Sequence, residues 1–129
     1  GLAIRYASVS PDQEKLQAEV TEILEKECAA AKAADVQTWN RYSDEFHLVF
    51  YRYCTNSRLA ESAERLRSGI SIFSNQYCRE TVIQTRIDEE HLAIFQAYKD
   101  GDIEKAVQMM KTHLNDSLNY ALRFLPKTF

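Results

Sequence analysis

The stretch "DEEHLAIFQAYKDGDIEKAVQMMKTHL", residues 88–114, contains the clearest helix boundary in the chain. In its first half, Ile94 follows His91 by three residues, which places both on one face of a helix. In its middle, Gly101 suits the residue that ends one helix, and Asp102 suits the N-cap of the next. The stretch therefore predicts two consecutive helices joined by a short turn.

Helical spacing also accounts for the beginning of the chain. Ser10 is predicted to be the N-cap of a helix, with Pro11 at its first position and Gln13 three residues after the cap, as in a capping box. This helix is expected to fade in the alanine-rich residues 28–35. Its apolar stripe is Leu16, Val20, Ile23 and Leu24.

Asp35 is the predicted N-cap of the next helix, which continues to about residue 54. Its apolar stripe is Val36, Trp39, Phe46, Phe50 and Cys54. Asn56 is then suited to cap a third helix that starts with "SRLAESAERL".

Residues 57–99 are too many for one ordinary helix. We expect a break near Gly69 and a second one between Tyr77 and Asp88. The last helix, after Asp102, has the apolar stripe Ile103, Ala106, Val107, Met110, Leu114, Leu118 and Leu122. No segment alternates as a β-strand would, so the sequence predicts an all-α antiparallel helical bundle of five to seven helices.

Composition agrees with one folded domain over residues 1–129. The chain is 45% hydrophobic and has only three glycines and two prolines, which excludes a disordered tail. The net charge is −3 and no run of Lys or Arg stands out, so nothing indicates binding to nucleic acid or to an anionic membrane. Three widely spaced cysteines, without a signal peptide or a transmembrane run, fit buried thiols in a reducing cytoplasm.

The chain has three histidines, His47, His91 and His113, and each faces the apolar side of a different predicted helix. His47 lies three residues before Phe50, and His113 lies three residues after Met110. Three inward histidines on three helices can converge, and imidazole nitrogen is a common ligand for zinc and similar ions. The plain alternative is three separate core histidines, each with its own hydrogen bond. Spacing alone does not decide between the two interpretations.

Two aspartates precede histidines by three residues, Asp44 before His47 and Asp88 before His91. They are either solvated or orient the imidazole rings as hydrogen-bond partners.

Two long motifs resemble one protein family. "DVQTWNRYSDEFHLVFYRYCTNSRL", residues 35–59, resembles the "D-x-x-F-H … N-x-x-L" signature of the FCD domain, and residues 88–114 resemble its C-terminal "E-H … G-D … M-x-x-H-L" motif. FCD domains are the C-terminal effector-binding halves of FadR-type regulators in the bacterial GntR family. The resemblance covers nearly the whole chain.

This resemblance implies an all-α bundle with an interior ligand pocket for a small carboxylic acid. Many members also hold a divalent metal there through one Asp and three His. His47, His91 and His113 match the three histidine positions, which implies a metal site, with zinc favoured and nickel or manganese as alternatives. Ser43 stands where the family usually has the Asp, and Asp44 comes one residue late. Asp44 can substitute only with some adjustment, and the change either weakens metal binding or leaves the pocket metal-free.

Residues one helical turn from the histidines are expected to line the effector pocket. They are Ser43, Phe50, Ile87, Phe95, Met109, Ser117 and Tyr120. A cationic clamp for the effector is also expected, for which Arg67 or Arg65 is the candidate. The alternative is that both arginines are exposed on a helix face.

Regulators of this family carry an N-terminal winged-helix domain, and no such segment precedes Leu16. We therefore expect a chain that senses an effector, forms a homodimer, reaches DNA only through the absent domain, and has no enzymatic activity. One alternative is a helical metalloenzyme, because Asp-x-x-His occurs on two helices, although no inward glutamate is evident for a di-iron site. The other alternative is a metal-free structural dimerisation module.

Overall fold

The structure is a computed structural model, and it describes residues 2–54, 58, 61 and 81–122. These residues form five α-helices and no strand, which confirms the predicted all-α fold for this part of the chain. The helices are α1 (Leu2–Ser8), α2 (Gln13–Lys32), α3 (Val36–Arg52), α5 (Thr81–Lys99) and α6 (Ile103–Leu122). The predicted cap at Asn56 and the predicted break at Gly69 lie outside the described residues.

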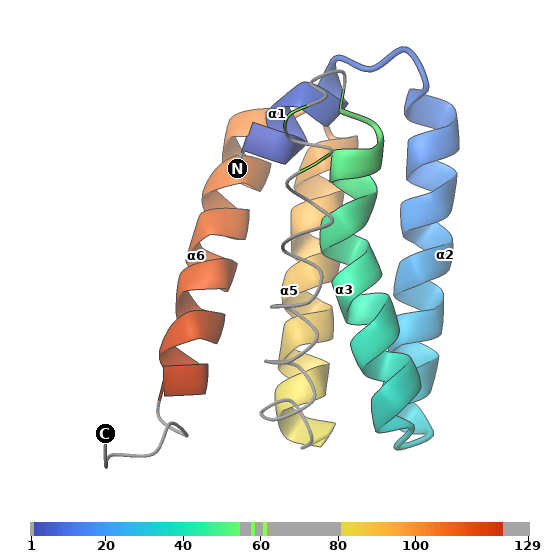
Figure 1. The fold of residues 1–129 in the computed structure, drawn as a ribbon, viewed down its shortest axis with the longest axis vertical. Coiled ribbons are helices and arrows are strands. Elements are labelled where there is room, and N and C mark those ends of the chain that lie inside the picture. The colour runs from blue at the N-terminus through green and yellow to red at the C-terminus, as the bar shows by residue number, and fades with distance from the viewer. Residues whose placement is uncertain (1, 55–57, 59–60, 62–80, 123–129) are drawn as a thin grey trace.

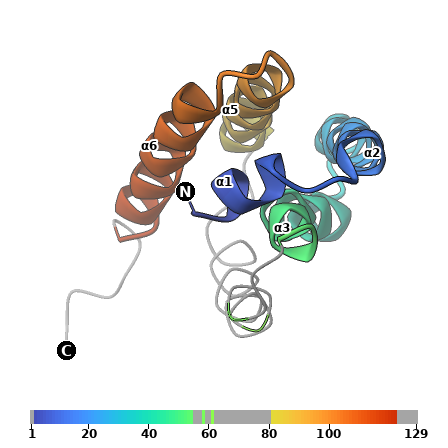
Figure 2. The ribbon, with the colours of Figure 1, turned by 90° about the horizontal axis from the view of Figure 1, so that it is seen from above.

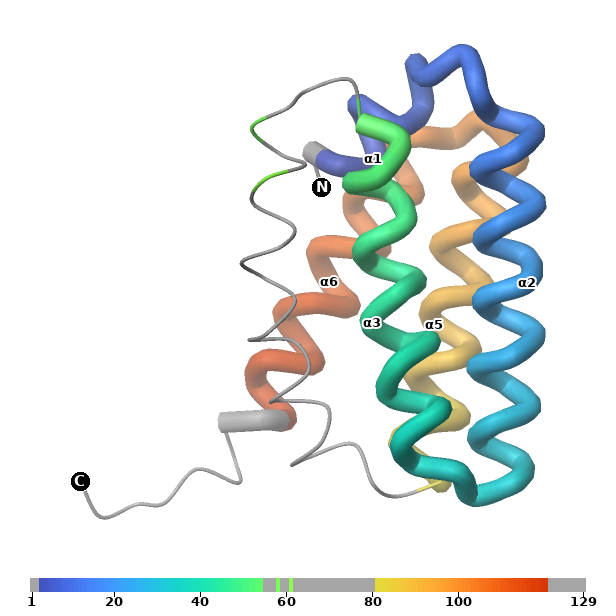
Figure 3. The backbone as a smooth tube through the Cα atoms, turned by 45° about the vertical axis from the view of Figure 1, so that its right-hand side comes forward, coloured from blue at the N-terminus to red at the C-terminus, as the bar shows by residue number. Residues whose placement is uncertain are grey.

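Four long helices form an antiparallel bundle (Figure 1). α2 packs against α3 and against α5, and α5 packs against α6, with the chain direction reversed in each of these pairs. The short helix α1 lies across one end of the bundle and contacts α3 and α6, as the view from above shows (Figure 2). Figure 3 shows that α6 is inclined away from the other three long helices.

The sequence did not predict α1, because seven residues are too few to show a periodic pattern. The predicted capping role of Ser10 is wrong: α2 begins at Gln13, after Asp12 as N-cap. The Gln13 amide instead connects three elements. Its Nε2 donates to the backbone oxygens of Ala7 and Ser10, and its Oε1 accepts a hydrogen bond of 2.6 Å from the Tyr98 hydroxyl.

The predicted boundary around Gly101 is confirmed. Gly101 has a φ of +80°, and its N–H donates to the Tyr98 oxygen at 3.1 Å. The N–H of Asp102 donates to the Ala97 oxygen at 3.0 Å, which completes a Schellman motif. The Asp102 carboxylate then accepts from the N–H of Lys105 and caps α6.

The turn between α2 and α3 has the same design but lacks the glycine. Ala34 has a φ of 56°, and the N–H of Asp35 donates to the Ala30 oxygen at 3.0 Å. Asp35 in turn accepts from the N–H of Thr38, as predicted for the N-cap of α3. An alanine in the left-handed region is strained, because its Cβ approaches the neighbouring carbonyl oxygen.

Replacing Ala34 with glycine should therefore stabilise the domain. Ala34 is exposed, so no packing is lost, and we expect a gain of about 0.5–1 kcal/mol in the free energy of unfolding. Urea denaturation measures this change. Ala33→Gly is the matched control, because Ala33 has a φ of −82° and the substitution there should destabilise the domain. A lower unfolding midpoint for Ala34→Gly would contradict the expectation.

The predicted apolar stripe of α6 is buried in its first half and exposed further along, and the side chain of Leu122 lies outside the described residues. Ala106, Val107 and Met110 are buried, whereas Leu114 and Leu118 are 45% and 50% exposed. Periodicity identifies an apolar face, but it does not show how far along the helix neighbouring elements cover that face.

The core consists of two apolar clusters separated by a polar layer. The larger cluster joins α1, α2, α3, α5 and α6, and includes Phe46, Ile94 and Met110. The smaller cluster, near the α2–α3 turn, includes Trp39 and Ile87. The buried polar residues of α2, α3 and α5 that fall between the clusters along each helix are Glu27, Asn40, Ser43, Asp44, Asp88 and His91. Such a layer needs internal hydrogen bonds, because buried polar groups lose their contacts with water.

Candidate metal centre

The three histidines converge beside this polar layer. His47 comes from α3, His91 from α5 and His113 from α6, and one ring nitrogen of each lies within 4.8 Å of the others. His91 and His113 are buried and His47 is partly buried. Helix phase predicted three inward-facing histidines, and the geometry shows that they meet at one point. Among the described residues this is the single group of three or more His, Cys, Asp or Glu side chains within that distance.

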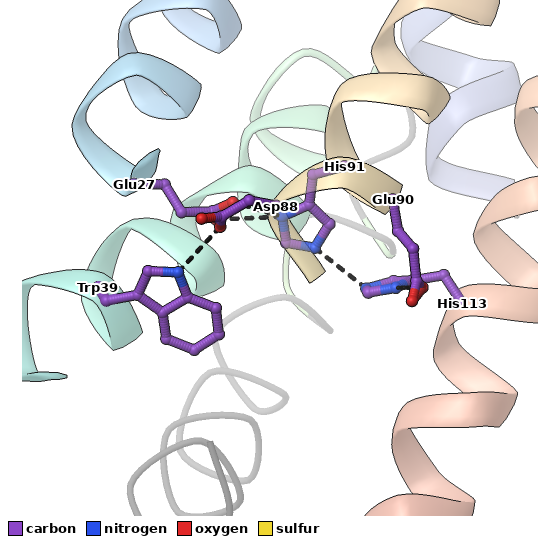
Figure 4. Close-up of polar contacts among 6 residues, drawn as sticks. All are labelled: Glu27, Trp39, Asp88, Glu90, His91 and His113. Atoms are coloured by element: carbon purple, nitrogen blue, oxygen red, sulfur yellow. Dashed lines mark hydrogen bonds and ion pairs between the residues drawn. The ribbon is translucent and has the colours of Figure 1, made fainter. Parts of the chain in front are cut away.

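Two carboxylates contact the far side of two of the rings (Figure 4). Both carboxylate oxygens of Glu27, on α2, lie 3.0 Å from Nδ1 of His91. The carboxylate of Glu90, on α5, lies 2.8 Å from Nδ1 of His113. The two Nε2 atoms of His91 and His113 face each other at 3.0 Å. Each ring is therefore held between a carboxylate on its Nδ1 side and another histidine on its Nε2 side.

These contacts determine the tautomers of both rings. A carboxylate accepts hydrogen bonds, so Nδ1 of His91 and Nδ1 of His113 each carry the proton that they donate to Glu27 and Glu90. In neutral rings the Nε2 atoms then have lone pairs and no proton. Two lone pairs facing each other at 3.0 Å repel unless a cation lies between them.

The carboxylate of Glu27 belongs to a longer buried network. It shares a hydrogen bond with Asp88, and the Asp88 Oδ1 accepts a hydrogen bond of 2.9 Å from the indole N–H of Trp39. Burial raises the pKa of Glu27 to about 7, although the hydrogen bond from Asp88 lowers it. Burial, together with the neighbouring Glu27, raises the pKa of Asp88 to about 8. Because both pKa values are raised, the two carboxyl groups share a proton at neutral pH, and the Glu27 carboxyl group contacts both Asp88 and Nδ1 of His91.

Two of the three rings, His47 and His91, are neutral at neutral pH. Burial lowers the pKa of His47 and of His91 well below the usual value for histidine, and neighbouring histidines lower it further. Neutral imidazole is the form that binds a metal ion. These two rings therefore do not have to release a proton before they accept a cation at neutral pH.

Phe46 supports the ring of His91. Its ring stacks on the His91 imidazole with centroids 4.2 Å apart and an angle of 14° between the planes. It also meets His47 edge-on at 5.5 Å. The aromatic ring thus limits the rotation of His91 and is the member of the larger apolar cluster that borders the site.

The structure places the other predicted site residues in different surroundings. Asp44 and Ser43 are buried on α3, and the Asp44 carboxylate is not among the ligand atoms that lie within 4.8 Å of one another. Phe50 and Phe95 belong to the larger apolar cluster, and Ile87 belongs to the smaller one. The remaining residues are Met109, Ser117 and Tyr120, which are partly buried on α6, and Arg65 and Arg67, which lie outside the described residues.

One groove reaches the site from the surface. It runs between α5 and α6, and its lining includes Arg86, Glu90, Met109 and His113. Arg86 stands at this groove with its Nε 3.6 Å from the Glu90 carboxylate. The sequence analysis did not identify Arg86, because a single exposed arginine on a helix carries no pattern.

The residues present fit a divalent metal ion. Two nitrogen atoms bound to one tetrahedral zinc ion lie about 3.3 Å apart, since each Zn–N bond is about 2.0–2.1 Å. The observed Nε2–Nε2 distance of 3.0 Å is close to that value, and the third histidine lies within 4.8 Å. His47, His91 and His113 would supply the protein ligands, and a bound metal would supply a Lewis-acidic centre that attracts oxygen ligands.

Glu27 was not identified from the sequence, where no inward glutamate was evident. Glu27 is 0% exposed. It follows Leu24 by three residues and Val20 by seven, so it lies in phase with the apolar stripe of α2. A glutamate in phase with a buried stripe is the signal that would have identified it.

The fold and the site together define a class of small all-α domains with buried histidines at the centre of a helical bundle. The profile of the FCD domain matches residues 1–116, so the chain belongs to the FCD family, the effector-binding domains of GntR-family regulators. No curated protein and no solved structure shows a significant match. In the part of the chain that the structure describes, no helix is both long enough and apolar enough to cross a membrane.

Proposed function

We propose that this domain senses a small carboxylic acid for a transcriptional regulator, and that a divalent metal bound by His47, His91 and His113 forms part of the sensor site. The observation that carries this proposal is the pair of facing Nε2 atoms, 3.0 Å apart, whose opposite ring nitrogens both contact carboxylates. Membership of the FCD family supports the sensor role. Zinc is the favoured ion because three imidazoles suit it, and nickel and manganese are the alternatives.

The chemistry of the site favours an acidic effector. Three protein ligands leave at least one coordination position of a metal open, and carboxylate oxygen is a suitable ligand for it. The groove between α5 and α6 leads from the surface to His113, with Arg86 on its wall. We propose this groove as the route by which the effector reaches the site. Glu89, Glu90 and Asp116 also line the groove, so the attraction for an effector carboxylate comes from the proposed metal and not from the groove wall.

The metal-binding histidines lie on different helices, so binding at the site can change how these helices pack. The three histidines lie on α3, α5 and α6, and Glu27 adds α2 to the network. An effector that binds one arrangement of these helices more tightly than another shifts the population toward that arrangement. We propose that the domain acts in a homodimer and that this shift repositions DNA-binding domains carried elsewhere in the regulator.

A thermal-shift screen tests the sensor role. Metal-loaded protein is mixed with small mono-, di- and hydroxycarboxylic acids and with sugar acids, and each acid is compared with its neutral amide. A true effector at 100 times its Kd stabilises the folded state by about 2.7 kcal/mol, which raises Tm by several degrees. We expect at least one acid to do so, with a smaller shift after chelation. If every acid and its amide give the same Tm, the domain is not a carboxylate sensor.

A further inference from the structure

Two carboxyl groups beside the histidines, those of Glu27 and Glu90, are not ligands in the proposed metal site but contact two of the rings that are. Glu27 and Glu90 are remote from each other in sequence and lie on different helices, yet each contacts the Nδ1 atom of a different ring. Glu27 is fully buried, and Glu90 is partly exposed at the groove. A carboxylate with no exposed surface is costly unless its partners compensate for lost water, so its position needs an explanation.

We propose that Glu27 and Glu90 are positioning residues that fix the tautomers of His91 and His113, so that both Nε2 lone pairs face the point shared with His47. This inference rests on the proposed metal site and adds the residues that prepare it. In neutral histidine either nitrogen can carry the proton, and the hydrogen bond at one nitrogen decides the state of the other. Without an acceptor at Nδ1, a proton on Nε2 blocks the ligand atom.

Directionality along the network supports this assignment. The Trp39 indole N–H donates to Asp88, Asp88 shares its proton with Glu27, and Glu27 accepts from Nδ1 of His91. Every donor in this hydrogen-bond network meets an acceptor, and the network ends on the lone pair of the His91 Nε2. Trp39 lies on α3, Asp88 on α5 and Glu27 on α2, so packing of three helices holds the carboxylate in place. Asp88 therefore acts through Glu27 and does not need to touch His91.

The charge of the site also supports a role for Glu27 and Glu90. Three neutral imidazoles bring no charge to a divalent cation, which leaves two positive charges in the interior of the bundle. The carboxyl groups of Glu27 and Glu90 can supply compensating negative charge through their hydrogen bonds to Nδ1, on the opposite side of each ring from the ligand atom. This charge acts through His91 and His113, so it does not require a carboxylate ligand on the metal.

Substitution of Glu27 tests the inference. Glu27→Met keeps the length of the side chain and removes the acceptor, whereas Glu27→Gln keeps an oxygen that can accept from Nδ1 but removes the charge. Glu25→Gln is the matched control, since Glu25 is exposed on the same helix. We expect zinc affinity to fall about 10–100-fold in Glu27→Met, to fall less in Glu27→Gln, and to stay unchanged in the control.

A second readout does not depend on metal. ¹⁵N NMR of the histidine rings in chelator-treated protein distinguishes a proton on Nδ1 from one on Nε2. We expect His91 to be protonated on Nδ1 in the wild type and to gain Nε2 protonation in Glu27→Met. Glu90→Ala should likewise cause His113 to gain Nε2 protonation. Because the Glu90 side chain is partly exposed, this variant should fold even if Glu27→Met does not.

The outcomes separate this inference from the proposed function. A wild-type domain that binds no zinc overturns the metal site, whereas the ring tautomers still decide whether the carboxylates position the rings. If folded Glu27→Met or Glu90→Ala keeps the wild-type tautomer and binds zinc within twofold of the wild type, the carboxylates are ordinary core and surface residues and the inference is wrong.

Discussion

Replacing His91 with alanine should abolish retention of the proposed divalent metal. His91 lies at the centre of the site, because its Nε2 faces His113 and its ring packs beside that of His47 with centroids 5.0 Å apart. Removing it leaves two histidines, which is fewer than the three protein ligands usual for a site with one open position. We expect affinity to fall by more than the 10–100-fold that loss of an outer hydrogen bond costs. Metal content after gel filtration measures the loss.

His91→Asn separates ligation from folding. An asparagine side chain retains an N–H that can donate to Glu27, but it has no ligand atom at the position of Nε2. The variant should fold as the wild type does and still lose the metal. Leu92→Ala is the control, since Leu92 is the next residue on α5 and is largely exposed. Retention of one metal per chain by both His91 variants would show that the three-histidine site is incorrect.

Replacing Phe46 with alanine should cause the largest loss of stability. Phe46 is 0% exposed, belongs to the larger apolar cluster, and packs against both His91 and Phe50. Truncating a core phenylalanine to alanine lowers the free energy of unfolding by about 3–5 kcal/mol, because buried apolar area is lost and a cavity is left behind. Urea denaturation gives the change in the free energy of unfolding.

The conservative variant refines this prediction. Phe46→Leu fills most of the space and should cost less than Phe46→Ala, but it removes the stacked ring and so weakens the orientation of His91. Leu118→Ala should change stability by no more than about 0.5 kcal/mol, because Leu118 is half exposed. A cost below about 1 kcal/mol for Phe46→Ala would mean that the ring does not support the core as described.

Helix phase predicted that each histidine faces the interior, because phase depends only on local geometry. Residues three and four apart on a helix share a face, so the spacing from His47 to Phe50 and from Met110 to His113 was sufficient for that prediction, whereas their convergence on one point depends on how the helices pack. The caps at Asp35 and Asp102 were predictable for the same reason: both depend on a short side chain and the next few backbone N–H groups.

What the sequence could not show depends on contacts between elements. Glu27 was overlooked because glutamate is usually exposed, and only its partners on α5 explain its burial. Leu118 was placed on the apolar stripe of the last helix, but it is half exposed, since periodicity does not reveal where a neighbouring helix stops covering a face. Gln13 was assigned to a capping box, whereas its amide bonds to the end of α1 and to Tyr98, which are tertiary contacts.

The central claim, that the three histidines bind one divalent metal, is tested most directly by calorimetric titration. Zinc is titrated into chelator-treated wild-type protein, and the stoichiometry is read per chain. We expect one tight site per chain, lost in His91→Asn and weakened in Glu27→Met. A wild-type titration without a saturable site, or a site that His91→Asn leaves intact, would contradict it.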